Sequence, residues 1–343
     1  MARIGILTGG GDCPGLNSVI RAVVRKGINH GYEILGIKNG WKGLIESDCL
    51  SLNLDAVSGI LPKGGTILGT SRTNPYKKEG ELEKVQANYK KLGLDALIAV
   101  GGEDTLSVAV KLIKDGIPNI VGVPKTIDND LSCTDYTFGF DTALNTATEC
   151  IDKLHTTAES HHRIIVVEVM GRHAGWIAIE SGIAGGADVI LIPEIPVDIE
   201  EVCEIIKKRH NRGKTFSIVV VAEGAQFKKG KFVTQEQKLD EFGHVRLGGM
   251  GEILGQEIGK RTGYETRVSV LGHIQRGGTP SAFDRILGTR FGVKAVELVI
   301  NKKFGRMVAL AGNKVIDVQI QDAVATLKTV DMDLYEIAKV FFS

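Results

Sequence analysis

Residues 97–105 read Leu-Ile-Ala-Val-Gly-Gly-Glu-Asp-Thr. The first four residues are aliphatic and predict a short buried strand, and the two glycines predict a sharp turn at its end. The acidic pair Glu103 and Asp104 has little use in packing, because charged side chains are rarely buried without a partner. The stretch therefore predicts a strand whose carboxyl end carries chemistry, and a solvated turn is the alternative.

Similar aliphatic runs recur along the chain, separated by segments of helix length. Short runs rich in Val and Ile with this spacing are typical of parallel strands covered on both faces, and ligands of such sheets bind at the carboxyl ends of the strands. The chain is therefore predicted to be a doubly wound α/β protein. The other predicted strands lie at residues 4–8, 120–123, 164–169, 189–192, 218–221 and 268–271, the predicted helices at 249–261 and 281–302, and the predicted loops at 193–196 and 227–246.

Composition limits the class of protein. The chain has 343 residues, 43% of them hydrophobic and only 6% aromatic, which indicates an aliphatic core large enough for two domains. Its 42 Lys and Arg against 41 Asp and Glu leave a net charge of +1, which gives no support to binding of nucleic acid or of an anionic membrane.

Cysteine usage and hydropathy indicate a cytoplasmic protein. The five cysteines show neither a CxxC motif nor metal-ligand spacing, so they are predicted to be free thiols in a reducing compartment. No apolar run approaches the roughly 18 residues that cross a bilayer, and the chain opens with a strand-like segment instead of a signal peptide.

Two glycine-rich stretches are candidates for holding phosphate. Residues 9–17, Gly-Gly-Gly-Asp-Cys-Pro-Gly-Leu-Asn, lie between a predicted strand and a helix, where backbone N–H groups can cradle an anion. Neither a Walker A motif nor a complete dinucleotide-binding motif fits, and a tight turn is an equally good interpretation. Residues 63–72 offer further glycines and Arg72, with a surface loop as the alternative.

Residues 124–130, Pro-Lys-Thr-Ile-Asp-Asn-Asp, are the stronger signal. Asp128 and Asp130 are two residues apart, so in an extended strand both side chains would point to the same side. An aspartate near Lys125 and a metal ion stays ionised and can accept a proton from a hydroxyl group. Mg²⁺ prefers few carboxylates together with phosphate oxygens, and Glu103 can supply one. Together these groups suit phosphoryl transfer.

Arginines follow two further strands. Met170-Gly171-Arg172 comes after residues 164–169, and residues 271–278 read Leu-Gly-His-Ile-Gln-Arg-Gly-Gly. With Arg163 and Arg267, four arginines are predicted near glycine-rich strand ends, enough to grip a phosphomonoester in bidentate fashion. Taken singly, each arginine could be a surface charge and His273 a structural histidine.

At this point the chain resembles the 6-phosphofructokinase family over nearly its whole length. Residues 10–17, 126–130, 170–172 and 272–278 carry the family's motifs in the family's order. The resemblance implies two α/β domains with the active site in the cleft between them. The phosphoryl-donor domain would comprise residues 1–138 and 252–303, and the fructose 6-phosphate domain residues 139–251 and 304–343.

The resemblance also implies residue roles and Mg²⁺ as the cofactor, held by Glu103. Asp128 matches the general base, with Lys125 and Arg172 beside the transferring group. Arg163 and Arg267 match arginines that reach into a neighbouring subunit's site, which implies a homo-oligomer, dimer or tetramer. The expected donor contacts are Gly10, Gly11, Arg72, Gly102, Asp104 and Lys125, and the expected sugar-phosphate contacts are Thr126, Ile127, Asp128, Asp130, Met170, Gly171, Arg172, Glu223, His273 and Arg276.

Two positions indicate the donor. Nucleotide-using bacterial members usually have glycine where Asp104 and Lys125 stand, whereas pyrophosphate-using members have Asp and Lys. Glycine lets the α-phosphate and ribose pass close to the backbone, while an aspartate adds bulk and negative charge. The expected reaction is reversible phosphoryl transfer from pyrophosphate to the 1-hydroxyl of fructose 6-phosphate, in glycolysis and gluconeogenesis.

Three alternatives stay open on the sequence. The first is the same reaction with ATP as the donor. The second is a lipid or NAD kinase with a related glycine loop, against which the arginine and histidine motifs speak. The third is a polyphosphate- or nucleotide-sensing module without catalytic activity, which the intact Asp128 and Lys125 disfavour.

Overall fold

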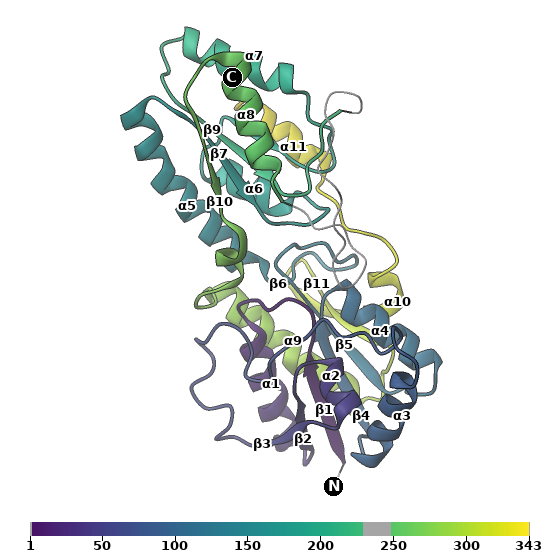
Figure 1. The fold of residues 1–343 in the computed structure, drawn as a ribbon. Coiled ribbons are helices and arrows are strands. Elements are labelled where there is room, and N and C mark those ends of the chain that lie inside the picture. Colours follow the sequence, from purple (N-terminus) through teal and green to yellow (C-terminus); the bar gives the residue numbers. More distant parts are fainter. Residues whose placement is uncertain (1, 229–247, 343) are drawn as a thin grey trace. The chain divides into compact units, whose positions relative to one another are not determined.

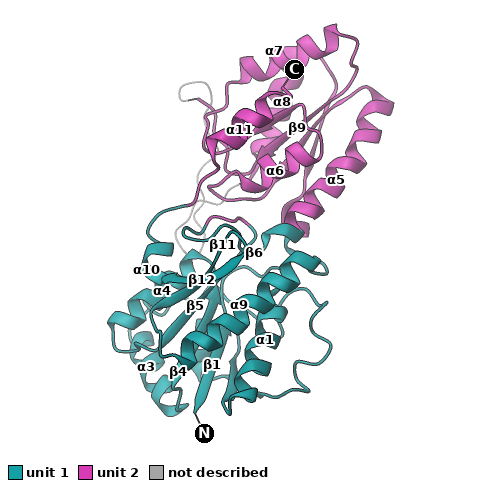
Figure 2. Cartoon of the chain, turned by 180° about the vertical axis from the view of Figure 1, so that it is seen from behind, with its two compact units in different colours: residues 1–127, 131–142, 276–327 teal, residues 128–130, 143–275, 328–343 magenta. Residues whose placement is uncertain are grey.

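The computed structural model describes residues 2–228 and 248–342. Contacts divide the chain into two compact units, coloured separately in Figure 2. Unit 1 comprises residues 1–127, 131–142 and 276–327, and unit 2 comprises residues 128–130, 143–275 and 328–343. Most of the predicted loop at 227–246 lies outside the described residues.

Unit 1 is built on a mostly parallel sheet with strand order β12-β11-β5-β4-β1-β2-β3, and β6 pairs with β5 (Figure 1). Strands β3 and β12 run antiparallel to their neighbours at the two edges. The strands are β1 (Arg3–Thr8), β2 (Glu33–Ile37), β3 (Cys49–Leu52), β4 (Ala96–Gly101), β5 (Ile120–Thr126), β6 (Phe138–Gly139), β11 (Arg306–Ala311) and β12 (Lys314–Gln319).

Helices cover this sheet, which explains why every residue of β4 and β5 is buried. Helices α1 and α9 pack against each other closely. A Cβ on Gly292 would lie 2.7 Å from the Cβ of Ala22, so the glycine permits this approach. The helices of unit 1 are α1 (Leu16–Asn29), α2 (Trp41–Glu46), α3 (Glu81–Lys91), α4 (Glu103–Lys114), α9 (Ala282–Ile300) and α10 (Ile320–Ala323).

Unit 2 has a wholly parallel sheet of order β10-β7-β9-β8 among the residues described. Its strands are β7 (Ile164–Val169), β8 (Val189–Leu191), β9 (Ser217–Ala222) and β10 (Thr266–Val270). Its helices are α5 (Phe140–His161, whose first three residues belong to unit 1), α6 (Trp176–Ala184), α7 (Ile199–Asn211), α8 (Met250–Thr262), the 3₁₀ helix η1 (Gly272–Arg276, whose last residue belongs to unit 1) and α11 (Met332–Lys339).

The two units differ from the sequence-based division in two short segments, residues 128–130 (in unit 2) and 139–142 (in unit 1), and in two long ones. Helix α8 packs on β7 and β10, and β10 pairs with β7, so residues 252–275 belong to unit 2. Strand β11 pairs with β5 of unit 1, which places residues 304–327 in unit 1. Strand pairing between distant segments decides both assignments, and the sequence pattern does not reveal it.

Candidate active site

The glycine turn after β1 is held in place by backbone and hydroxyl contacts of unit 1. The amide of Gly9 donates to the carbonyl of Val100 (2.9 Å), at the end of β4. The Thr70 hydroxyl donates to the carbonyl of Gly10 (2.6 Å), and the Gly10 amide donates to the carbonyl of Ser71 (3.2 Å). The turn and the predicted loop at 63–72 therefore lie together at the carboxyl ends of β1 and β4.

Thr105 explains why glycine stands at two of these positions. A Cβ on Gly9 would lie 2.6 Å from the Thr105 hydroxyl, and one on Gly101 would overlap the same side chain. The first turn of α4 can pack into this corner because both neighbours lack side chains. Thr105 is buried and positions the turn, a role that the sequence reasoning missed because threonine is common in such turns.

Glu103 and Asp104 form the first turn of α4, directly after β4. Acidic groups are favourable at a helix N-terminus because of the partial positive charge there. Glu103 is exposed, and its Oε1 accepts a hydrogen bond from the Ser107 hydroxyl at 3.5 Å. Among the described residues no group of three or more His, Cys, Asp or Glu could hold a metal ion. Mg²⁺ bound mainly by phosphate oxygens needs only one or two carboxylates, so Glu103 fits that type of site.

Two cationic side chains contact Gly11 of the glycine turn. Lys125 of β5 is 4% exposed, and its amine donates to the Gly11 carbonyl. The guanidinium of Arg276 lies against the same glycine: a Cβ on Gly11 would overlap its Nη1 and lie 2.9 Å from its Cζ. Arg276 was expected among the sugar-phosphate residues, and in the structure it lies beside the glycine turn after β1 in unit 1.

Asn17 holds the loop at 63–72. Its side-chain amide donates to the carbonyls of Lys63 (3.0 Å) and Gly64 (3.4 Å), and its side-chain oxygen accepts from the amide of Ile67 (2.9 Å). The side chain is only 1% exposed. The segment is therefore a loop anchored by Asn17, and Lys63, Ile67 and Arg72 in it are exposed, so the surface-loop interpretation stays open.

The two aspartates after β5 lie beyond the end of the strand, so the strand alternation that would point both side chains to one side does not apply to them. Strand β5 ends at Thr126, and Asn129 between the aspartates has a left-handed φ of 51°. Asp128 and Asp130 are nevertheless both buried, and the carbonyl of Asp130 accepts from the amide of Lys328 at 3.0 Å. The turn, and not strand alternation, sets their directions.

In unit 2, residues after β7 and β9 come together. The amide of Arg172 donates to Oε1 of Glu223 at 3.1 Å, and a Cβ on Gly224 would overlap the Arg172 carbonyl. The amide of Met170 donates to the side-chain oxygen of Gln275 (3.4 Å), which ties η1 to the same place. Gln275 is fully buried and was not among the predicted site residues.

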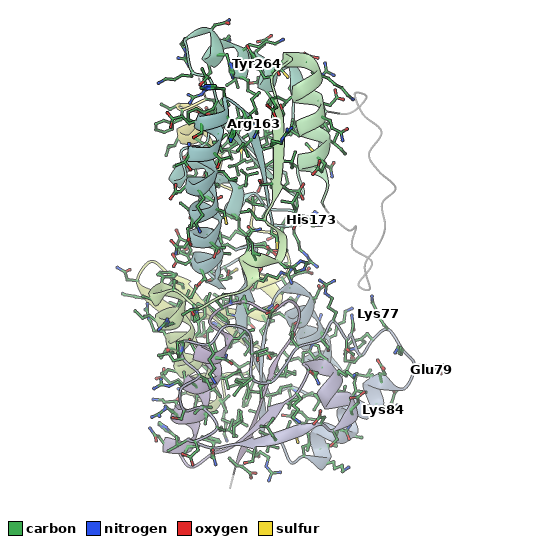
Figure 3. All side chains as sticks on the ribbon, turned by 60° about the vertical axis from the view of Figure 1, so that its left-hand side comes forward. Lys77, Glu79, Lys84, Arg163, His173 and Tyr264 are labelled. Atoms are coloured by element: carbon green, nitrogen blue, oxygen red, sulfur yellow. The ribbon has the colours of Figure 1, made fainter. Side chains whose placement is uncertain are left out.

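Arg163 and Arg267 lie elsewhere, which corrects the prediction of four arginines near strand ends. Arg163 precedes β7 whereas His173 follows it, as Figure 3 shows, and a strand of this length spans about 20 Å. Arg267 is near the start of β10, opposite Ile165 of β7. Glu265 binds both arginines, at 2.9 Å (Arg163) and 2.6 Å (Arg267), and the hydrogen bond from Arg163 lowers the pKa of the Glu265 carboxyl.

His273 is exposed within η1. No helix among the described residues is both long and apolar enough to cross a membrane.

The candidate site thus has two groups of residues. In unit 1 these are the glycine turn after β1, the carboxylates of Glu103 and Asp104, and the amine of Lys125. In unit 2 they are Arg172 and Glu223, at the carboxyl ends of the strands.

Residues 3–299 match the family model described as phosphofructokinase. The chain belongs to the phosphofructokinase family. A pyrophosphate-fructose 6-phosphate 1-phosphotransferase of Streptomyces coelicolor is 60% identical over 342 residues, covering 99% of both chains. An ATP-dependent 6-phosphofructokinase 3 of the same organism is 54% identical over 329 residues, covering 96% of both.

The fold also matches solved phosphofructokinases. The structure of phosphofructokinase from Saccharomyces cerevisiae superposes with a TM-score of 0.81 at 32% identity, covering 99% of this chain and 47% of the yeast chain. This chain therefore spans about half of that larger phosphofructokinase. The likeness establishes the phosphofructokinase fold for both units, while the two bacterial relatives have different phosphoryl donors in their names.

Proposed function

We propose that this phosphofructokinase moves a phosphoryl group from pyrophosphate to the 1-hydroxyl of D-fructose 6-phosphate. The products are fructose 1,6-bisphosphate and inorganic phosphate, and the reaction runs in both directions. The observation that carries the choice of donor is the buried Lys125, whose amine contacts the Gly11 carbonyl in the glycine turn. The 60% identity with a pyrophosphate-named relative supports the same choice.

Asp128 acts as the general base in this proposal. It accepts the proton of the sugar 1-hydroxyl as the oxygen attacks the transferring phosphorus, and the P–O bond of the anhydride breaks to release phosphate. General base catalysis of this kind contributes about 10²–10⁴-fold in rate. Lys125 and Arg172 offset the negative charge that spreads over the transferring group.

Phosphofructokinases generally use Mg²⁺, and we propose Glu103 as its protein ligand here. Bound Mg²⁺ neutralises charge on the pyrophosphate oxygens. The exposed carboxylate of Glu103 in the first turn of α4 is suited to hold it together with phosphate oxygens. Turnover should therefore stop when a chelator removes the metal and return when Mg²⁺ is added.

The sugar phosphate is proposed to bind the residues at the carboxyl ends of the unit 2 strands, with Met170, Gly171, Arg172 and Glu223 as its main contacts. Arg163 and Arg267, at the opposite ends of β7 and β10, would serve the site of a neighbouring subunit. A homo-oligomer, dimer or tetramer, follows from this proposal. An active monomer in sedimentation measurements would contradict it.

Charge explains why ATP should be the poorer donor. Asp104 would face the extra phosphate and ribose of a nucleotide. Two unit charges about 4 Å apart repel by roughly 4 kcal/mol at an effective dielectric of about 20, and solvent and Mg²⁺ reduce this. Even half of that repulsion lowers affinity more than about tenfold.

The test compares pyrophosphate and ATP at matched concentrations, with fructose 1,6-bisphosphate formation as the readout. Strong preference for pyrophosphate supports the role of Asp104 and Lys125. Equal or faster turnover with ATP would favour the ATP-dependent activity named for the 54% identical relative. Turnover with neither donor would support a sensing module without catalysis.

A further inference from the structure

The segment that leads into α11 binds the turn that carries Asp128 and Asp130. The last part of unit 2 begins at Lys328, whose amide donates to the carbonyl of Asp130 at 3.0 Å. One residue earlier, Leu327 of unit 1 pairs with Leu131 in an antiparallel bridge. Two passages of the chain between the units therefore run side by side, and the C-terminal passage holds the backbone of the turn.

This turn lies beyond the ladder of its own strand. Strand β5 ends at Thr126, and the buried Asn129 has a left-handed φ of 51°. Such a backbone conformation is uncommon for a residue with a side chain and persists where the surroundings fix it. Asp128 is the proposed general base, and the position of its carboxylate follows the backbone of this turn. Contacts that hold the carbonyl of Asp130 therefore bear on the position of the base.

The indole of Trp176 holds Lys328 by two contacts. Its Nε1 donates to the Lys328 carbonyl at 3.0 Å, and the Lys328 amine lies over the ring, 5.0 Å from its centroid. A cation over the face of an indole is attracted by the negative charge of that face. Trp176 is the first residue of α6. Lys328 thus joins Asp130, through its amide, to the start of α6, through its carbonyl and its amine.

Glu194, in the loop after β8, joins the same segments a second time. Its Oε1 accepts from the amide of Gly175, the N-cap of α6 (3.0 Å), and from the amide of Val330 (2.9 Å). The glycine permits this approach, because a Cβ on Gly175 would lie 2.9 Å from the Glu194 Oε2 and 2.5 Å from the Cβ of Ile192. One carboxylate therefore fixes the start of α6 to the residue two positions after Lys328.

The start of α6 also continues the loop that is proposed to bind the sugar phosphate. The amide of Ala174 donates to the carbonyl of Gly171 at 3.0 Å, and Arg172 between them has a left-handed φ of 52°. The loop is thus a tight turn directly before α6. A connected set of contacts runs from this loop to the turn at 128–130, and all of its residues belong to unit 2.

We propose that Trp176 and Glu194 are positioning residues for the reaction: through residues 328–330 they fix the turn that carries Asp128 relative to the loop that carries Arg172. The proposal rests on the proposed function and deepens it. Neither Trp176 nor Glu194 needs to touch a substrate. Their contacts matter because the distance from the base to the sugar 1-hydroxyl depends on both segments, and a misplacement of about 1 Å can cost about 10²-fold in rate.

The chain offers matched variants for the test. Trp176→Phe keeps an aromatic ring but removes the N–H that binds the Lys328 carbonyl. Trp41→Phe is its control, because Trp41 is the other of the two tryptophans and its buried N–H has no hydrogen-bond partner among residues 2–228 and 248–342. Glu194→Ala removes the acceptor of both amides, whereas Glu194→Gln keeps an acceptor oxygen.

The measurement is the steady-state formation of fructose 1,6-bisphosphate by the full chain with Mg²⁺, together with thermal unfolding of each variant. Trp176→Phe should lower kcat at least about fivefold and Glu194→Ala at least about tenfold, with KM for the phosphoryl donor unchanged within about twofold. Glu194→Gln should recover most of the kcat that Glu194→Ala loses. Trp41→Phe should keep kcat within about twofold of wild type.

The same changes in an Asp128→Asn background separate positioning of the base from general stability. Trp176→Phe should not lower the residual kcat of Asp128→Asn any further, because residues that act through one group show non-additive effects. Its effect on thermal unfolding should be the same in both backgrounds, since that effect does not pass through the base.

A kcat of Trp176→Phe equal to that of Trp41→Phe would overturn the proposal. So would losses of kcat that add to the loss in Asp128→Asn, because Trp176 would then act on the whole unit and not through the base. Full activity of Asp128→Asn, or a wild type that turns over neither pyrophosphate nor ATP, would instead refute the proposed function. Should ATP prove the faster donor, the same comparisons made with ATP test the positioning role, which does not depend on the donor.

Discussion

Asp284 accepts two hydrogen bonds from Thr142, one from the backbone amide at 2.8 Å and one from the hydroxyl at 2.6 Å. Asp284 lies in the first turn of α9 and is fully buried, and Thr142 lies in the first turn of α5. The Thr142 hydroxyl also accepts from the amide of Ser281, the N-cap of α9 (3.0 Å). The starts of two helices are thus joined through one carboxylate.

Protonation of Asp284 should make stability depend on pH. Burial raises its pKa from 3.8 to about 6, although the hydrogen bonds from Thr142 act to lower it. Because the folded-state pKa is the higher one, the contribution to stability is fully present below about pH 4 and is lost as pH rises through about 6. Two pKa units correspond to roughly 3 kcal/mol.

Urea unfolding of wild type and Asp284→Asn at pH 4 and pH 7 measures this effect. The free energy of unfolding of wild type, relative to that of the variant, should be ~3 kcal/mol larger at pH 4 than at pH 7, so that wild type is the more stabilised at pH 4. Thr142→Val removes a hydrogen bond that lowers the pKa of Asp284, so the pKa of this carboxyl should be higher in the variant. The loss of stability with rising pH should therefore continue to a higher pH in Thr142→Val than in wild type. A difference between wild type and Asp284→Asn that does not change with pH would contradict the prediction.

Asp128→Asn should separate catalysis from binding. If Asp128 is the general base, kcat should fall about 10²–10⁴-fold with little change in KM for fructose 6-phosphate. Asp130→Asn is the matched variant, because Asp130 is buried in the same turn and is proposed to bind the sugar. That variant should mainly raise KM. Equal losses of kcat in both variants would argue against a special role for Asp128.

Asp104→Gly should relax the choice of donor. The ratio of kcat/KM for ATP to that for pyrophosphate should rise at least about tenfold, because one negative charge is removed from the path of the nucleotide. Asp115→Gly is the control, because it also removes one negative charge but at the C-terminal end of helix α4, away from the glycine turn. This variant should leave the ratio of kcat/KM for the two donors unchanged. Lys125→Gly should lower turnover with pyrophosphate more than turnover with ATP.

Glu168 should prove important for the stability of unit 2. It is buried in β7, and its carboxylate accepts from the amides of Gly249 (3.3 Å) and Gly251 (2.7 Å) at the start of α8. Glu168→Ala would leave these donors without their acceptor, so the free energy of unfolding should fall by about 1–3 kcal/mol. Glu168→Gln keeps one acceptor oxygen and should lose less. Unchanged thermal unfolding of Glu168→Ala would refute this capping role.

The strands and helices of the chain could be predicted from local patterns, with gaps at the sheet edges. All seven predicted strands are present, and the predicted helices at 249–261 and 281–302 correspond to α8 (Met250–Thr262) and α9 (Ala282–Ile300). Strands β2, β3, β6, β11 and β12 were missed. Every residue of β12 is partly buried or exposed, so its hydrophobic signal is weak, and its pairing with β11 makes it a strand.

The sequence by itself determined the α/β class, the phosphofructokinase motifs and the acidic, glycine-rich strand ends, because these depend on residue types a few positions apart. Only the tertiary structure decided that β10 joins unit 2, that Asn129 between Asp128 and Asp130 has a left-handed φ, and that Arg276 lies on Gly11. These features depend on contacts between segments distant in the chain and on single backbone angles. Neither leaves a periodic pattern in the sequence.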